Sequence, residues 1–367
     1  MTSNLPVALY VHVPFCDTIC GYCDFFRVKN QAALVDRWLM ELQLEATQRI
    51  TNKKFDTVYL GGGTPTCIDE QQLQCLLEIL LPYTQDCCEY TVEVNPETIT
   101  QKKVQLLRQY GVNRVSMGVQ SVNEELLKVM TRAHTKNDIE QALIWFKEAG
   151  IKNISLDCMY SLPQQTMEQL EETVQQIVKW DVPHISIYSL TIEPHSQFYK
   201  DGKNALDEEI EADMYEWIIS YLEKSGYYRY EISNFAKKGY ESKHNKHYWK
   251  YHDFVAISLG ASGKENGKRY DNVTNFQDYF NHCYIKQEIP LQLQDQQFET
   301  LMMGLRLDEG INIDLFNQRF QCHFMSEYAG AVQEALKRGW IFFENGYLKC
   351  TKDGLNLCNS VIELFMQ

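Results

Sequence analysis

The 367-residue sequence lacks a long hydrophobic run, and it lacks a surplus of positive charge. A membrane-spanning helix needs about 20 consecutive apolar residues, so we expect no integral membrane segment. The 35 Lys and Arg residues face 49 Asp and Glu residues, which gives a formal net charge of −14. Because nucleic-acid binding depends on clustered basic side chains, this balance argues against a nucleic-acid partner.

Export signals and internal repeats are missing as well. Residues 1–6 show neither the charged nor the apolar region of a secretory signal, and no Arg-rich transit segment is expected before the first strand. The sequence has twelve cysteines. Without an export signal, these are expected to be reduced thiols or metal ligands rather than a disulfide framework. We therefore expect a cytoplasmic protein.

Apolar strand-like segments alternate with amphipathic helical segments through the first half of the chain. Strands are predicted at residues 8–13, 57–60, 90–94, 114–117, 154–159 and 184–190. Helices are predicted at residues 32–50, 69–81, 101–110, 124–130, 136–149 and 167–180. Six successive β–α units indicate an α/β fold with a parallel sheet and right-handed crossovers. Periodicity alone does not decide between a barrel and an open sheet.

Three cysteines directly follow the first predicted strand. Cys16, Cys20 and Cys23 have the spacing Cys-x3-Cys-x2-Cys, and thiolates at this density favour an iron–sulfur cluster or zinc. A closed zinc site takes four protein ligands, and no second ligand pair follows here. A cubane cluster has four irons, so three cysteines leave one iron open. The alternative is a chance group of buried thiols; the favoured interpretation is a metal cofactor with an open coordination position.

Other unusual residues also follow predicted strands. Gly61-Gly62-Gly63-Thr64-Pro65 comes after the second, and its glycines would let a ligand approach the backbone closely. Glu93, Gln120 and Asp157 lie at or near the ends of the third, fourth and fifth. A single carboxylate of this kind is most often a cap or an ion-pair partner. Several together at the carboxyl ends of parallel strands are typical of barrel-like α/β enzymes.

The last part of the chain has a different pattern. Helices are predicted near residue 294, at residues 313–320 and at residues 326–337, and Glu344-Asn345-Gly346 marks a hairpin turn before a last helix. These elements predict a small winged-helix-like α+β module without a basic recognition face. We expect three regions: the β–α units at 1–235, a connecting region at 236–290, and the module at 291–367.

These motifs, in this order, resemble the radical S-adenosylmethionine superfamily. Within it they resemble the group that contains oxygen-independent coproporphyrinogen III dehydrogenase and the HemW heme chaperones. Ser116–Ser121, Arg132, Leu156-Asp157 and Tyr160–Pro163 match later elements of that group. The resemblance implies a partial (β/α)6 barrel with a HemN-type C-terminal module. It also implies a [4Fe-4S] cluster on the three cysteines, with S-adenosylmethionine on the open iron.

The resemblance carries over further binding residues. For the S-adenosylmethionine bound to the cluster, the matching positions are Tyr10, Gly62 and Glu93. For a second S-adenosylmethionine, bound in the dehydrogenase, the matching positions are Tyr22, Gly63, Thr64, Gln120, Arg132 and Asp157. The second site is therefore inherited by analogy with the dehydrogenase alone.

Three features favour the chaperone group over the dehydrogenase. Phe25 stands where the dehydrogenase loop normally carries a further cysteine. Fifteen residues precede Cys16, fewer than the dehydrogenase's N-terminal extension would need. The run from His244 to Trp249 fits the His-Asn-x-x-Tyr-Trp motif that is associated with heme binding in HemW proteins.

The chemistry of this run also suits heme, which needs an axial imidazole, aromatic surface and cations near its propionates. His244 is the preferred ligand because the motif names it, and His247 is the second choice. Tyr248 and Trp249 supply aromatic surface, and neighbouring lysines supply positive charge. The alternative is an aromatic loop packed on the barrel edge with solvated lysines.

We therefore expect a heme chaperone of the HemW type that carries a [4Fe-4S] cluster and S-adenosylmethionine and transfers heme to an acceptor protein. Respiratory cytochromes or oxidases are reasonable acceptors for this family. The alternative is a coproporphyrinogen III dehydrogenase, which oxidatively decarboxylates two propionates; a radical enzyme acting on RNA is disfavoured by the charge. Still open are the use of radical chemistry, the mode of heme attachment, occupancy of the second site, and a homodimer.

Overall fold

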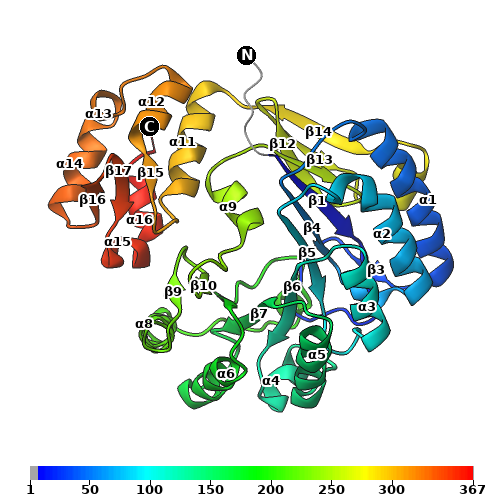
Figure 1. The fold of residues 1–367 in the computed structure, drawn as a ribbon. Helices are drawn as coiled ribbons and strands as arrows, with labels where there is room; N and C mark the ends of the chain where they lie inside the picture. The colour runs from blue at the N-terminus through cyan, green and yellow to red at the C-terminus, as the bar shows by residue number, and fades with distance from the viewer. Residues whose placement is uncertain (1–6, 367) are drawn as a thin grey trace.

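The computed structural model describes residues 7–366 and contains a curved twelve-stranded sheet with helices along its outer face (Figure 1). Residues 1–6, on which the expectation about a secretory signal depends, lie outside the described residues. Six neighbouring strands are parallel and follow one another in chain order. They are β1 (Ala8–Val13), β4 (Thr57–Gly62), β5 (Glu89–Val94), β6 (Arg114–Gln120), β7 (Asn153–Tyr160) and β8 (His184–Ser189). All six predicted strands are confirmed.

The helices between these strands cover the outside of the sheet (Figure 1). They are α1 (Ala32–Arg49), α2 (Glu70–Thr84), α3 (Gln101–Gln109), α4 (Glu124–Val129), α5 (Lys136–Glu148) and α6 (Met167–Lys179). Capping boxes at Asp69, Thr135 and Thr166 satisfy the free backbone amides at the starts of α2, α5 and α6. The α/β partial barrel expected from the sequence is confirmed.

Alternation of side chains along each strand separates an outer apolar face from an inner polar one. In β7, for example, Ile154, Leu156 and Cys158 belong to the hydrophobic core under the helices, whereas Ser155 and Asp157 lie on the opposite face. The same alternation in the neighbouring strands gives a barrel interior lined by polar groups.

The strands after β8 extend the sheet at both edges. β10 (Asn234–Ala236) and β9 (Tyr228–Arg229) follow β8, and α8 (Glu208–Lys224) precedes them. On the other edge, β11 (Phe254–Ile257) pairs in parallel with β1, and three antiparallel strands continue from it: β12 (Ser262–Glu265), β13 (Lys268–Asn272) and β14 (Ile285–Pro290). Residues 254–290 thus continue the barrel sheet, while the expected boundaries at 235 and 290 stay predictions.

Five short elements complete this part of the chain. They are β2 (Phe15–Cys16), which pairs with β3 (Val28–Lys29), the 3-10 turn η1 (Pro65–Cys67), α7 (Gln197–Lys200) and α10 (Phe276–Phe280). The pairing of β2 with β3 fixes both ends of the cysteine loop.

The C-terminal module has its own hydrophobic core, which includes Phe316, Phe324 and Phe365. Its elements are α11 (Leu293–Gly304), β15 (Ile311–Asn312), α12 (Ile313–Phe320), α13 (Phe324–Glu327), α14 (Ala329–Lys337), β16 (Ile341–Glu344), β17 (Tyr347–Cys350), α15 (Lys352–Asn356) and α16 (Cys358–Glu363). The predicted hairpin is β16–β17, and β15 joins it in a three-stranded sheet. The predicted last helix is divided at Leu357, and the helix predicted at 326–337 is divided at Tyr328.

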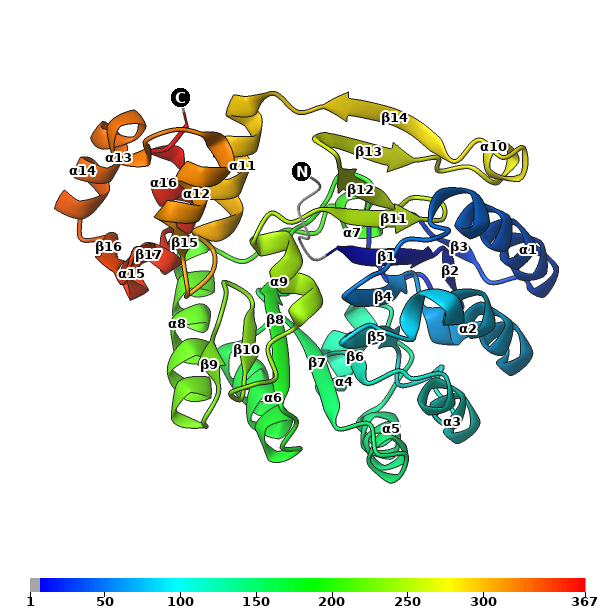
Figure 2. The same ribbon diagram turned by 45° about the horizontal axis from the view of Figure 1, so that its top comes forward.

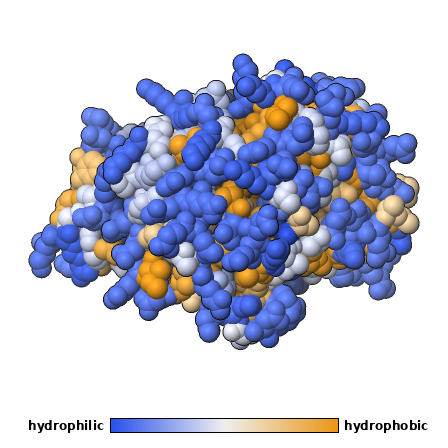
Figure 3. All heavy atoms as spheres, turned by 90° about the horizontal axis from the view of Figure 1, so that it is seen from below, coloured by the Kyte–Doolittle hydropathy of each residue, from blue (hydrophilic) through white to orange (hydrophobic). Residues whose placement is uncertain are grey.

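The surface matches the acidic composition. The face in Figure 3 is mostly hydrophilic, with small and separate hydrophobic spots. Within residues 7–366, no helix is both long and apolar enough to cross a membrane.

Candidate functional site

The three predicted cluster ligands lie on the loop that follows β1. Cys16 ends β2 and is buried, whereas Cys20 and Cys23 are partly exposed. The amide of Cys23 donates to the carbonyl of Cys20 over 3.2 Å, which makes a tight turn. Arg27 donates to the carbonyl oxygens of Cys23 and Phe25 and holds the far side of the loop.

The three thiols are not arranged as the ligands of a single metal ion would be. Among the described residues, no three His, Cys, Asp or Glu side chains converge on one ion position. In a cubane cluster each cysteine binds a different iron, so its ligands do not need to converge on one point. Burial raises the pKa of Cys16 to about 12, although the hydrogen bond with Thr64 lowers it in part. A bound metal cation would lower the pKa of this thiol and deprotonate it.

A continuous series of polar contacts joins two of the cysteines. Cys16 Sγ lies 3.7 Å from Thr64 Oγ1, and the side-chain amide of Asn95 donates to the same oxygen over 3.0 Å. Arg132 donates to Asn95 Oδ1 over 3.0 Å, and its other terminal nitrogen lies 3.5 Å from Cys20 Sγ. These contacts fix the cysteine loop to the ends of β4 and β5, and they place the guanidinium of Arg132 beside the thiol of Cys20.

The glycine run at the end of β4 leaves only backbone facing this loop. Gly62 has φ of +109°, and a Cβ there would lie 2.4 Å from the ring of His12. A Cβ on Gly63 would lie 2.4 Å from the carbonyl oxygen of Phe15. Because a side chain fits at neither position, the loop can approach a ligand only through its main chain. This fits the expected close approach of S-adenosylmethionine.

Glu93 lies next to the glycine run, half-buried near the end of β5. Its carboxylate accepts hydrogen bonds from the amide of Gly62 over 3.0 Å and from the hydroxyl of Tyr59 over 2.8 Å. Burial raises the pKa of Glu93 to about 7; the bond from Tyr59 lowers it and the charge of Asp157 raises it. A nearby cation favours the charged carboxylate, so this position suits a positively charged ligand group.

Asp157 and Gln120 lie further along the same polar face. Asp157 accepts from the hydroxyls of Ser116 over 2.9 Å and Ser155 over 3.1 Å, and burial raises its pKa to about 6. Gln120 ends β6 at a register shift, with φ of +64°, a left-handed conformation that costs about 1–3 kcal/mol in a non-glycine residue. The hydroxyl of Tyr188 donates to Gln120 Oε1 over 3.4 Å.

The two predicted tyrosines have different surroundings. The hydroxyl of Tyr10 donates to His12 Nδ1 over 2.9 Å, and His12 Nε2 donates to the carbonyl of Phe26 over 2.7 Å. Burial lowers the pKa of His12 to about 4, so this ring is neutral and both of its nitrogens are satisfied. Tyr22 packs edge-on against Phe198, with ring centroids 6.4 Å apart.

The predicted heme motif forms α9 (Lys243–Trp249), which lies on the inner side of the curved sheet (Figure 2). Glu89, the first residue of β5, accepts from the backbone amides of Lys243 over 3.0 Å and His244 over 2.8 Å. The helix therefore sits at the amino ends of the parallel strands, whereas the cysteine loop lies at their carboxyl ends.

Both ring nitrogens of His244 already have partners. Nδ1 lies 2.8 Å from the hydroxyl of Thr57, and Nε2 lies 2.8 Å from the hydroxyl of Tyr248. The ring stacks on Tyr59 at 5.0 Å and is 1% exposed. His247 is also buried, and its Nδ1 lies 3.4 Å from Nδ1 of His252. In this conformation His244 anchors the helix.

The sequence interpretation missed most of the polar barrel interior. The residues concerned include His12, Tyr59, Thr91, Arg114, His184 and Tyr188. A signal was present, because polar residues recur at every second position in strands that are otherwise apolar, as in Arg114 and Ser116 of β6. Such a pattern predicts a strand with one apolar face and one polar face.

Comparison with known proteins agrees with this architecture. The radical SAM superfamily matches residues 10–177, and the HemN C-terminal domain matches residues 291–357. The heme chaperone HemW of Lactococcus lactis subsp. lactis (strain IL1403) is 35% identical over 98% of this chain and 97% of its own length. The chain belongs to the HemW family. The heme chaperone HemW of Bacillus subtilis (strain 168) is 34% identical over 97% of this chain and 98% of its own length.

The same fold occurs outside the HemW family. The coproporphyrinogen III oxidase HemN of Escherichia coli has a TM-score of 0.87 and 22% identity, and the match covers 98% of this chain and 90% of that one. At this identity the likeness shows the fold alone. The radical SAM superfamily match in this HemW family chain implies a [4Fe-4S] cluster and S-adenosylmethionine as cofactors.

Replacing Cys20 by serine should abolish the intact cluster while the fold is retained, because serine removes one of the three predicted ligands from a loop at the surface. Anaerobic reconstitution followed by iron analysis and visible absorbance measures the loss. Cys75→Ser, at an exposed position on α2, is the matched control and should retain the cluster. Unchanged iron content in Cys20→Ser would remove this loop from the cluster site.

Glu93 should make the cofactor-free chain less stable as pH rises. The pKa of Glu93 is about 7 in the folded chain, above the ordinary value of 4.5, so the folded state binds this proton more tightly than the unfolded state. The stabilisation of the folded chain by this proton is complete below pH 4.5 and is lost as the pH rises through 7. The free energy of unfolding falls by about 3 kcal/mol over this range.

Urea denaturation at pH 5 and pH 8 measures this change. Glu93→Gln should flatten the pH dependence, because an amide can still accept from the amide of Gly62 while the hydroxyl of Tyr59 turns to accept from it. Equal pH dependence in the two proteins would show that Glu93 does not titrate in this range.

Proposed function

We propose that the chain is a heme chaperone that binds heme and passes it to an acceptor protein. The full-length similarity to proteins named heme chaperone HemW carries this proposal. Phe25 supports it, because its side chain, 63% exposed, stands where the dehydrogenase loop carries a further cysteine.

We also propose which residues hold the resident cofactors. Cys16, Cys20 and Cys23 would hold the [4Fe-4S] cluster, and Tyr10, Gly62 and Glu93 would line the S-adenosylmethionine on its open iron. When bound, the cluster supplies the electron for reductive cleavage of S-adenosylmethionine. The chain itself supplies a backbone-lined approach at Gly62 and a carboxyl group at Glu93 that can accept a positively charged group.

This chain carries side chains that could bind a second S-adenosylmethionine through hydrogen bonds and an ion pair. The positions carried over from the dehydrogenase are Tyr22, Gly63, Thr64, Gln120, Arg132 and Asp157. Asp157 can accept hydrogen bonds from a ribose, and Arg132 can pair with a carboxylate. Arg132 is already engaged by Asn95 and by the carbonyl of Gly118 over 2.8 Å, so a second ligand would have to compete with these bonds.

The segment that carries His244 and His247 is the proposed heme-binding element. Its helix is fixed by Glu89 and Thr57 to the starts of two strands. For His244 to bind iron, it would have to give up a hydrogen bond on one ring nitrogen, so an anchoring role fits its surroundings better. Heme binding by the segment would then depend on α9 staying in place.

The acceptor is proposed to be a respiratory cytochrome or oxidase, and a homodimer is an additional proposal. We place the protein in the cytoplasm, where thiols stay reduced. All twelve cysteines lie within the described residues, and all are free thiols.

A hemin titration of the anaerobically reconstituted protein, followed by absorbance, tests heme binding. A saturable Soret band at about one heme per chain is expected. His244→Ala should weaken binding about tenfold without loss of the cluster, because loosening the helix by one buried hydrogen bond costs about 1–2 kcal/mol. His195→Ala, at an exposed position, is the control.

Absence of saturable hemin binding by the wild-type chain would reject the chaperone function. The dehydrogenase alternative would then be tested with coproporphyrinogen III, reductant and S-adenosylmethionine. Decarboxylated product would establish it.

A further inference from the structure

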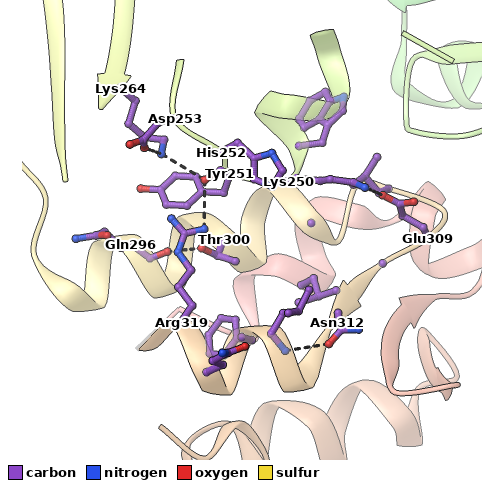
Figure 4. A pocket seen from close by; sticks show the side chains of 18 of the residues that line it. Lys250, Tyr251, His252, Asp253, Lys264, Gln296, Thr300, Glu309, Asn312 and Arg319 are labelled. Carbon is purple, nitrogen blue, oxygen red and sulfur yellow. Dashed lines mark hydrogen bonds and ion pairs between the residues drawn. The ribbon is translucent and has the colours of Figure 1, made fainter. Parts of the chain in front are cut away.

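A cavity of about 700 Å³ lies between the end of α9 and the C-terminal module. Its barrel side is formed by residues 249–253, which lead from α9 into β11, and its module side by parts of α11, β15 and α12 (Figure 4). This volume lies within the range of about 300–1,000 Å³ that is typical of small-molecule and cofactor sites.

The cavity is separate from the cysteine loop. Two of its lining residues, Val7 and Asp253, directly precede the parallel strands β1 and β11. The cysteines follow the other end of β1, which is six residues long and therefore spans about 20 Å. A ligand in the cavity would thus be held away from the cluster end of the barrel.

The cavity offers a cation, Arg319, on which the charge of Asp253 acts without forming an ion pair. Figure 4 shows Arg319 extending from α12 toward Tyr251, where it donates to the backbone carbonyl over 3.3 Å and lies 5.0 Å from the ring centroid. Within residues 7–366, no carboxylate lies at ion-pair distance from this guanidinium. By contrast, Lys250 and Lys264 each pair with a carboxylate of the cavity wall. Arg319 is therefore available for an anionic ligand group, and bidentate pairing with a carboxylate suits its geometry.

The remaining walls suit a flat apolar ligand. Leu307, Ile311 and Phe316 line the cavity together with the rings of Tyr251 and Trp249. Aromatic and aliphatic surfaces of this kind bind planar ring systems. The indole nitrogen of Trp249 is buried and has no hydrogen-bond acceptor among the described residues, so the cavity wall also holds an unused donor.

His252 supplies an imidazole to the same cavity (Figure 4). Its Nδ1 faces Nδ1 of His247 at 3.4 Å, and its Nε2 has no partner in the part of the chain that the structure describes. An imidazole nitrogen without a partner is a group that can bind a metal.

We propose that heme occupies this cavity, with Nε2 of His252 as an axial ligand of the iron and Arg319 as the partner of a propionate. The assignment rests on the proposed heme-binding function and adds a site that the His-Asn-x-x-Tyr-Trp motif does not contain. His247 then orients His252 through the contact between their Nδ1 atoms, and His244 anchors α9 beneath the cavity.

Hemin titrations of the cluster-loaded full-length chain test the site with three variants. His252→Ala should shift the Soret band and weaken hemin binding at least about tenfold, and free imidazole should restore the band by occupying the vacated position. Arg319→Gln should weaken binding about tenfold while leaving the Soret position unchanged, because it removes a charge-assisted bond but no iron ligand. His244→Ala should lower affinity without moving the band.

The cluster absorbance of each variant serves as the check on folding. If His252→Ala and Arg319→Gln both bind hemin with the affinity and Soret band of the wild-type chain, the cavity is rejected as the heme site. The proposed chaperone function would not be affected by that result. A Soret shift in His244→Ala but not in His252→Ala would assign the iron to His244 and overturn the proposal. Failure of the wild-type chain to bind hemin would reject the underlying function as well.

Discussion

The buried polar interior of the barrel is the constraint on which the other features depend. Polar groups removed from water need hydrogen-bond partners, and the inner face of the sheet carries Glu93, Asp157 and Arg114 where the outer face carries aliphatic side chains. Toward the carboxyl ends of the strands, Glu93 accepts from the amide of Gly62 in the glycine run and from Tyr59, and Asp157 accepts from Ser116 and Ser155 of the strands themselves. At the amino ends, α9 supplies the partners, with His244 bonded to Thr57 and its first amides bonded to Glu89. Each end of the barrel is thus closed by a segment that carries functional groups.

One tyrosine connects the two ends. The hydroxyl of Tyr59 donates to Glu93 beside the glycine run, and its ring stacks on His244 of α9. A ligand that changes the charge of Glu93 would act directly on the hydroxyl of Tyr59. The ring of the same residue helps to hold α9 in place through its stacking on His244. The contacts give a physical route by which the cofactor end can influence the segment that leads into the cavity. The route involves a single side chain in a strand, so it requires only a local change of hydrogen bonding.

The periodicity of apolar residues predicted the six parallel strands and the helices between them. In a strongly periodic segment such as Ala32–Arg49, the local sequence alone indicates the secondary structure. The residues carried over by resemblance from Gly62 to Asp157 lie on one polar face, since parallel strands bring their carboxyl ends together. The strands at residues 254–290 were not predicted, because β14 (Ile285–Pro290) is exposed throughout and has no apolar alternation. His252 and Arg319 were not predicted as a pair, since they are distant in sequence and only the packing of the module against the barrel brings them to one cavity.

The separation of the two ends bears on how a radical SAM fold could also carry the proposed heme cargo. A substrate that reacts with S-adenosylmethionine has to reach the carboxyl ends of the strands, where the cysteine loop lies. A cargo that is only held and released needs no access to that end, and a site at the amino ends protects it from the cofactor. The cavity beside His252 has this placement, and its module wall is formed by α11, β15 and α12 rather than by the barrel. That wall therefore belongs to a unit with a hydrophobic core of its own, separate from the core under the helices of the barrel.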